Sequence, residues 1–127
     1  MGDEPTEIKL SIPAAPEFLR LARLAAADVA SRAGFSYEDI EDLRIGVDEL
    51  CHVLMAPGTD GDHLELTFRL LADAVAVEGA GPPGASHHVS VQSELSRTIV
   101  AAVVDEHEVT TVDDVRRFRL LKRTPSP

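Results

Sequence analysis

The stretch VDELCHVLM, residues 47–55, contains the side chains whose spacing comes nearest to a chemical site. Glu49 precedes Val53 by four residues, about one helical turn, so both side chains would lie on the same side of a helix. A carboxylate followed one turn later by an amide would form half of a nucleotide site. Because the second residue is a valine, three alternatives arise: a working ATP site, a lost one, or no site.

Two other titratable side chains lie in the same stretch. Cys51 falls on the apolar side of the predicted helix, which favours a buried structural thiol. As the single cysteine, it excludes an internal disulfide and a multi-cysteine metal site. His52 has no nucleophile or orienting acid at suitable spacing, so we interpret it as a surface histidine rather than a catalytic base. We therefore expect no metal site.

An amphipathic helix must position Glu49 and Val53. Ser36 opens this helix, with Asp39 three residues later in an imperfect capping box. The apolar face of the helix shows the clearest periodicity in the sequence. Its residues are Ile40, Leu43, Val47, Leu50, Cys51 and Leu54.

The remaining elements follow from hydrophobic periodicity and turn residues. Alternation predicts a strand over residues 7–14 and a hairpin over 63–81 that turns near Ala72–Asp73. A second hairpin, over 107–123, would turn at Asp113–Asp114. A helix over 15–34 would direct Phe18, Leu21, Ala22, Ala25 and Val29 to the core, and one over 91–103 would carry Leu95, Ile99 and Ala102 on one side.

This order of elements predicts a single α/β (α+β) domain. Paired strands without regular βαβ alternation indicate a two-layer sandwich, with helices on one face of a mixed, mostly antiparallel sheet. The 127 residues suit one domain, which we place at 7–122 with flexible tails at 1–6 and 123–127.

The charge of the chain narrows the class of partner. The formal net charge is −10, from 22 acidic residues against 12 Lys and Arg. This balance repels phosphate and argues against direct nucleic-acid binding, whereas it favours a protein partner with a basic surface. Solubility alone is the alternative explanation. The sequence has no signal-peptide pattern and no run of 18 apolar residues, so we predict a cytoplasmic protein without a membrane span.

Four strings, taken in order, resemble the anti-sigma factor and serine-protein kinase family of the GHKL ATPase superfamily. They are SIPAAPEFLRLAR, IEDLRIGVDELCHVL, VAVEGAGP and VVDEHEVTTVDDVRRFRLLKR, and they span nearly the whole chain after residue 6. The resemblance implies the histidine-kinase-like ATPase fold, with ATP and Mg²⁺ bound between helices and a lid. It also implies partner switching: a homodimer holds an RNA polymerase sigma factor until an anti-anti-sigma protein binds instead.

The family's nucleotide motifs are altered in this chain. Its first motif has an Asn four residues after the Glu; Val53 stands there and offers no oxygen to Mg²⁺. Its second motif is Asp-x-Gly-x-Gly; Gly79 and Gly81 are present, but Val77 replaces the Asp. Glu78 is one residue out of register and would point to the opposite face unless a bulge intervenes. The segment after Gly84, ASHHVSVQSELSRT, lacks the glycines of the third motif.

The resemblance also places two arginines on a partner-binding surface. Arg23 matches a family arginine on the first helix, and Arg20 is its neighbour. Our leading hypothesis is an anti-sigma factor homologue that sequesters a sigma factor by protein binding, has lost ATP binding and needs no cofactor. The first alternative is an ATP- and Mg²⁺-dependent serine-protein kinase with Glu49 as catalytic base. The second is a degenerate pocket serving as a ligand-sensing or scaffolding module.

Overall fold

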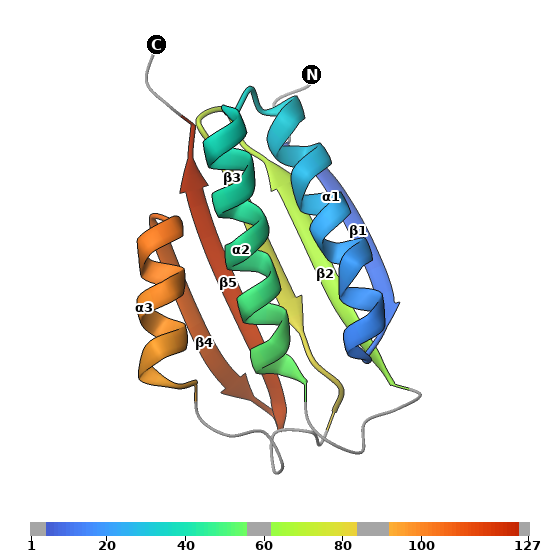
Figure 1. Ribbon diagram of the computed structural model, residues 1–127. Helices are drawn as coiled ribbons and strands as arrows, with labels where there is room; N and C mark the ends of the chain where they lie inside the picture. Colours follow the sequence, from blue (N-terminus) through green and yellow to red (C-terminus); the bar gives the residue numbers. More distant parts are fainter. Residues whose placement is uncertain (1–4, 56–61, 84–91, 125–127) are drawn as a thin grey trace.

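A computed structural model describes residues 5–55, 62–83 and 92–124 (Figure 1). The described elements follow the predicted order, with a short 3-10 helix added before the first α-helix. In chain order they are β1 (Thr6–Pro13), η1 (Pro16–Phe18), α1 (Leu19–Arg32), α2 (Tyr37–Leu54), β2 (His63–Leu70), β3 (Ala74–Ala80), α3 (Glu94–Val103), β4 (Glu106–Val112) and β5 (Val115–Arg123).

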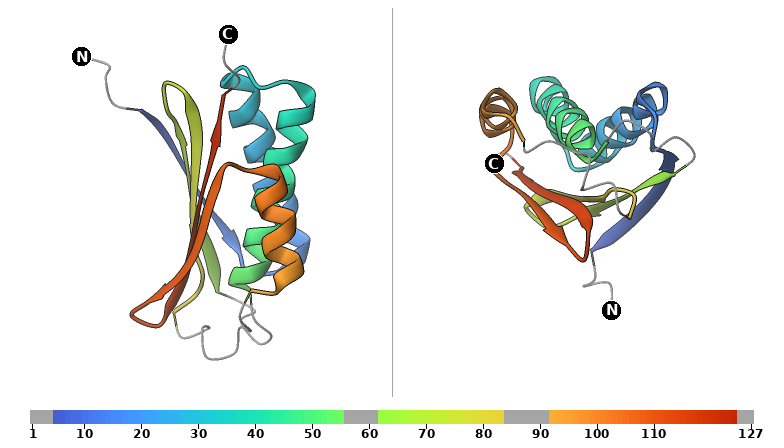
Figure 2. Two further views of the ribbon diagram at one scale, coloured as in Figure 1. Left: turned by 90° about the vertical axis from the view of Figure 1, so that its left-hand side faces the viewer. Right: turned by 90° about the horizontal axis from the view of Figure 1, so that it is seen from below.

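The five strands form one sheet in the order β1-β2-β3-β5-β4, and every neighbouring pair is antiparallel. The three described α-helices all lie on the same face of this sheet, and no described element lies on the other face, called the open face below (Figure 2). The predicted two-layer sandwich is therefore confirmed. In the part of the chain that the structure describes, no helix is long and apolar enough to cross a membrane.

The core lies between the sheet and the helices. As predicted, the alternating residues Leu64, Leu66 and Phe68 of β2 are buried, as are Val75 and Val77 of β3. The predicted apolar face of α2 is also correct: Ile40 is partly buried and the other five residues are fully buried. Strand alternation and helical periodicity thus fix which side of these three elements contributes to the core.

The predicted core face of α1 is partly wrong. Phe18 and Leu21 remain 37% and 46% exposed, whereas Leu19 and Ala26 are buried alongside the predicted Ala22 and Val29. The reason is local. Phe18 ends the 3-10 turn that precedes α1, so it does not occupy the first core position of the helix. Because leucines occur on several sides of this helix, periodicity alone did not select one face.

On α3 the side that carries Leu95 is not the buried one. Leu95 is 70% exposed, and the buried residues of this helix are Ser96 and Val100. The helix begins at Glu94, where the Oγ atom of Ser93 accepts a hydrogen bond from the Ser96 amide. The side of α3 that meets the sheet depends on where β4 and β5 lie, which the helix sequence does not encode.

The predicted turn of the second hairpin agrees with the structure. Asp113 and Asp114 both adopt positive φ, 51° and 66°, as a two-residue hairpin turn of type I′ requires. The first and last strands begin at Thr6 and end at Arg123, one residue beyond each end of the predicted domain. The predictions for the loop at 56–61, the glycine-poor segment at 85–91 and most of both tails lie outside the described residues.

Candidate functional site: a nucleotide-site frame on α2 and β3

The N-terminal end of α2 sets the position of Glu49 and Val53. Ser36 caps the helix as predicted, with its Oγ atom accepting a hydrogen bond from the Asp39 amide at 3.2 Å. From this start the helix runs 18 residues to Leu54 without interruption. The four-residue spacing therefore does place Glu49 and Val53 one turn apart on a continuous helix.

Both residues lie on the side of α2 that faces α3. Gly46 identifies this side, because a Cβ atom on it would lie 2.9 Å from Cγ1 of Val104, just after α3. Val53 follows Gly46 by seven residues, or nearly two turns, and Glu49 lies between them on the same flank. Each is partly exposed and lies off the buried face. The valine side chain carries no oxygen or nitrogen, so the pair Glu49–Val53 offers one carboxylate and no second ligand.

Val77 occupies the place of the missing Asp and belongs to the core. It is fully buried, and its neighbours across the sheet are Phe68 on β2 and Leu120 on β5. An ionised carboxylate at this position would be buried between two apolar side chains, which is unfavourable. The position is therefore built for packing and provides no hydrogen-bond acceptor for an adenine amino group.

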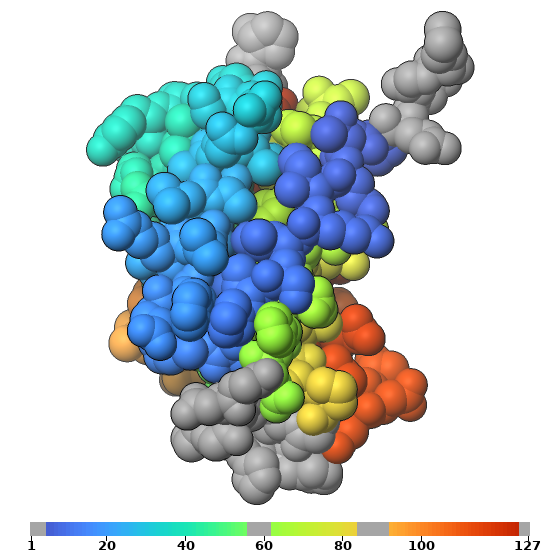
Figure 3. Space-filling model, turned by 90° about the vertical axis from the view of Figure 1, so that its right-hand side faces the viewer, coloured from blue at the N-terminus to red at the C-terminus, as the bar shows by residue number. Residues whose placement is uncertain are grey.

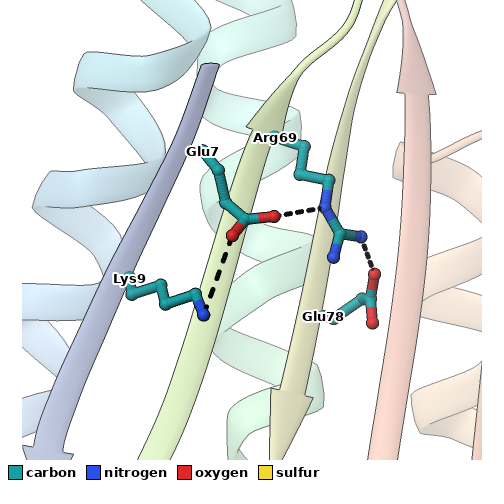
Figure 4. Close-up of polar contacts among 4 residues, drawn as sticks. All are labelled: Glu7, Lys9, Arg69 and Glu78. Carbon is teal, nitrogen blue, oxygen red and sulfur yellow. Dashed lines mark hydrogen bonds and ion pairs between the residues drawn. The ribbon is translucent and has the colours of Figure 1, made fainter. Parts of the chain in front are cut away.

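Glu78 points to the opposite face of the sheet, as the register predicted. The pairing of β2 with β3 is continuous from Glu65–Ala80 to Leu70–Val75, so the alternative of a bulge that would turn Glu78 inward is excluded. Figure 4 shows Glu78 beside Arg69 on the open face. The same guanidinium donates to Glu7 from its Nε atom at 2.8 Å and, by this bond, lowers the pKa of the Glu7 carboxyl.

The two glycines of this segment are explained by packing. A Cβ atom on Gly79 would lie 2.3 Å from Cε2 of Phe118, its buried partner on β5. A Cβ atom on Gly81 would lie 3.0 Å from the carbonyl oxygen of Leu54, the last residue of α2. The Gly81 amide also donates to the carbonyl of Arg116 at 2.9 Å. Both glycines therefore allow close approach of protein atoms, whether or not a ligand binds nearby.

Arg23 and Arg20 occupy the exposed side of α1. Arg23 donates from Nη1 to the Oδ1 atom of Asp48 on α2 at 2.7 Å, with about a third of each side chain exposed. Arg20 is exposed, and the apolar side chains of Leu21 and Leu24 beside it are 46% and 53% exposed. Figure 3 shows α1 and β1 side by side over the central part of this face of the molecule. A charged and apolar surface of this composition suits protein contact.

Cys51 is buried and His52 is exposed, as predicted, but an acid does lie near His52: the Asp48 Oδ2 atom is 3.7 Å from its Nδ1 atom. Cys51 is fully buried, and burial raises the pKa of its thiol to about 12, with the nearby Asp48 carboxylate adding to the effect. His52 is exposed, and its Nδ1 atom lies 2.8 Å from the carbonyl oxygen of Asp48, one turn earlier. Among the described residues, no group of three or more His, Cys, Asp or Glu is placed to hold a metal ion.

Sequence reasoning missed Lys122, a buried lysine that connects α2, α3 and β5. Its Nζ atom donates to the carbonyl of Val103 at 2.9 Å and lies 3.8 Å from carboxylate oxygens of Asp39 and Asp42. The signal was present in the sequence, because alternation along β5 places Lys122 on the same face as Phe118 and Leu120. The two acids at the start of α2, Asp39 and Asp42, partly neutralise this lysine.

Comparison with known proteins identifies the family. The serine-protein kinase RsbW of Bacillus pumilus is 36% identical over 111 residues, which cover 84% of this chain and 68% of that protein. The chain belongs to the RsbW serine-protein kinase family. The RsbW kinase of Halalkalibacterium halodurans is 35% identical over 75 residues, which cover 58% of the chain and 46% of that protein. The family resemblance inferred from the four strings is thus confirmed, although no family model matches the chain.

A solved structure supports the fold independently. A crystal structure of the RsbU and RsbW domains of a Mycobacterium tuberculosis protein superposes with a TM-score of 0.75 at 15% sequence identity. The match covers 96% of this chain and 33% of that one. The shared fold therefore extends over almost all of the chain, including helix α2, which carries Val53, and strand β3, which carries Val77.

Proposed function

We propose that this chain is an RsbW-type anti-sigma factor that acts by protein binding and has lost Mg·ATP chemistry. It would sequester an RNA polymerase sigma factor and release it when an anti-anti-sigma protein competes. The observation that carries this proposal is the pair of valines at the family's nucleotide positions, Val53 on α2 and the buried Val77 on β3. One removes a ligand to Mg²⁺ and the other removes the acceptor for adenine.

The rival enzyme is a serine-protein kinase that uses the retained Glu49. This carboxylate is partly exposed on the flank that faces α3, so a substrate hydroxyl could reach it. Phosphoryl transfer nevertheless depends on a metal ion to neutralise the phosphate charge, and the pair Glu49–Val53 provides one carboxylate and no second oxygen ligand for such an ion. We therefore favour the binding function over the kinase. A ligand-sensing or scaffolding role stays a further alternative without a specific observation in its favour.

Titration calorimetry with Mg·ATP separates the binding protein from the kinase. We expect no saturable heat at micromolar protein concentration. Micromolar affinity that disappears in Glu49→Ala would overturn the loss of nucleotide binding. Restoration is best attempted with Val53→Asn alone, because an Asp introduced at the buried Val77 would leave a carboxylate between Phe68 and Leu120 and endanger the fold.

We assign partner binding to the surface formed by Arg20, Leu21, Arg23 and Leu24 on α1. Arginine is enriched among interface residues whose truncation is costly, and the exposed leucines supply apolar area around it. The Asp48 carboxylate holds the Arg23 guanidinium in one orientation before a partner arrives. We also expect a homodimer, in keeping with the family resemblance.

A pull-down from the native cells tests the assignment of partners. The bait is the full chain, and the expected captured proteins are a sigma factor and an anti-anti-sigma protein. Arg20→Ala should weaken sigma capture by about tenfold or more. Arg32→Ala is the matched control, because Arg32 lies on the same helix but pairs with Asp28 of its own turn. Recovery of neither class of partner, or equal loss in both variants, would contradict the proposal.

A further inference from the structure

Two arginines on the open face of the sheet lack a partner within the described part of the chain. They are Arg117 and Arg119, which alternate along β5 with buried residues, so their side chains project from the face opposite the helices. Both residues are exposed. Neither guanidinium forms an ion pair or a hydrogen bond with another described residue. The two positive charges are therefore available to a partner.

The strand carboxylates of the open face are, with one exception, already engaged. Figure 4 shows two of them, one from β1 and one from β3, sharing a guanidinium from β2. The engaged carboxylates are Glu7 and Glu78, which pair with Arg69, Glu65, which accepts a hydrogen bond from Ser11, and Glu106, which pairs with Arg123. Engaged acids beside unpaired arginines are unexpected in a chain with a net charge of −10. This arrangement favours an anionic partner over a cationic one.

The strand register places the two arginines in different surroundings. Arg117 lies between an alanine on β3 and a threonine on β4, neither of which is charged. Arg119 lies between two acids, Glu78 and Glu108. Glu78 is engaged by Arg69, whereas Glu108 has no contact among the described residues. Arg117 should therefore contribute more than Arg119 to the binding of an anion, and the Glu108 carboxylate should oppose that binding.

A recess of about 140 Å³ lies on the open face beside Arg117. Strands β2, β3 and β5 all contribute to its lining. Ala80 lies between Glu65 and Arg117 in the register, and its short side chain leaves space between these two longer ones. At about 30 Å³ per water molecule, the recess takes roughly four or five non-hydrogen atoms, the size of a short side chain. A partner segment can therefore approach the sheet closely beside Arg117.

We propose that an extended acidic segment of a partner protein docks on this surface, with carboxylates two residues apart on Arg117 and Arg119. Alternate side chains on one face of a strand lie about 6.7 Å apart, and an extended segment has the same spacing. Each guanidinium presents paired N–H donors that match the two oxygens of a carboxylate. The surface lies on the face of the sheet away from α1, so this docking does not depend on the sigma-factor surface proposed above.

Nuclear magnetic resonance titration of the ¹⁵N-labelled full chain with short capped peptides tests the proposal. One peptide alternates glutamate with threonine and the control peptide alternates lysine with threonine, both at neutral pH and constant ionic strength, which holds general screening fixed. We expect the glutamate peptide to cause saturable shifts of the amides of residues 78–80 and 117–119. The lysine peptide should leave these amides unchanged, even where it shifts others. Unsaturable shifts with the glutamate peptide, or equal shifts of these amides with both peptides, would overturn the proposal.

Three single substitutions make the test specific. Arg117→Gln should weaken binding of the glutamate peptide by about threefold or more, because a charge-assisted pair of donors is lost. Lys9→Gln removes the same charge from β1 on the same face and should change the affinity by less than about 1.5-fold. Glu108→Gln removes the opposing acid and should strengthen binding by about twofold, a gain that loss of folding cannot imitate. Equal weakening in the first two variants, or weaker binding in the third, contradicts the proposal.

Two further measurements address other occupants of this surface. A short single-stranded DNA tests nucleic acid, and tighter binding of the DNA than of the glutamate peptide at residues 117–119 would reject the protein segment. A dilution series without peptide tests a second copy of the chain. Shifts of the same amides that depend on protein concentration alone would assign the surface to a second copy and reject the proposal, whereas we expect these amides to be independent of concentration.

Discussion

Gly79→Ala should destabilise the protein because of Phe118, in the absence of any ligand. The added Cβ atom would lie 2.3 Å from Cε2 and 2.8 Å from Cζ of the ring, whereas carbon atoms in contact normally lie about 3.5–4.0 Å apart. The ring would have to move by more than about 1 Å, yet Phe118 is 2% exposed and packed in the core. Overpacking of this kind costs about 1–3 kcal/mol.

One opposing term lowers the expected loss slightly. Replacing glycine by alanine restricts the unfolded chain, which favours folding by about 0.4–1 kcal/mol where the backbone tolerates it. The φ of Gly79 is not positive, so the backbone adds no strain of its own. We therefore expect a net loss of about 0.5–2.5 kcal/mol in the free energy of unfolding, measured by urea denaturation with circular dichroism.

The double-mutant cycle with Phe118→Leu isolates the ring contact. Leucine lacks the two ring atoms nearest to Gly79, so Gly79→Ala in that background should be neutral or slightly stabilising. We expect a coupling free energy of about 1 kcal/mol or more between the two positions. The reasoning is refuted if Gly79→Ala lies within about 0.3 kcal/mol of the wild type, or if the two changes are additive. Gly79 would then require another explanation, such as the close approach of a ligand.

Three further predictions concern buried or half-buried titratable groups. Lys122→Met should lower the free energy of unfolding by about 1–3 kcal/mol, since two carboxylates and a carbonyl lose their cation, whereas the exposed neighbour Arg123→Met should cost less than about 1 kcal/mol in the same urea assay. Cys51, with a pKa of about 12, should resist a thiol-specific disulfide reagent in the native protein at mildly alkaline pH and react only on unfolding; rapid native labelling would contradict its burial. His107 has a lowered pKa, so the unfolded chain takes up its proton first as the pH falls. The stability of the wild type should therefore fall relative to that of His107→Gln as acidification passes the ordinary histidine pKa; parallel pH profiles would show that the shift is absent.

The sequence by itself determined the buried face of each element whose apolar residues all fall on one side. On α2, apolar residues recur on a single face and Ser36 caps the start, so the helix, its buried side and the exposed flank with Glu49 and Val53 were all predictable. Strand alternation likewise determined that Val77 faces the core and that Glu78 faces away from it. The order of elements and the four family strings were enough to indicate the fold and the family.

Only the tertiary structure decided which face of α1 and α3 is buried. Both helices carry apolar residues on more than one side, so their orientation depends on the sheet and on neighbouring helices rather than on their own periodicity. The role of Gly79 also became visible only when the β3–β5 register placed Phe118 against it. The pocket lined by Arg97, His107 and Arg116 follows the same principle, because these residues come from α3, β4 and β5. Local sequence patterns determine whether a segment forms a helix or a strand. Contacts between segments distant in sequence depend on how the whole chain packs.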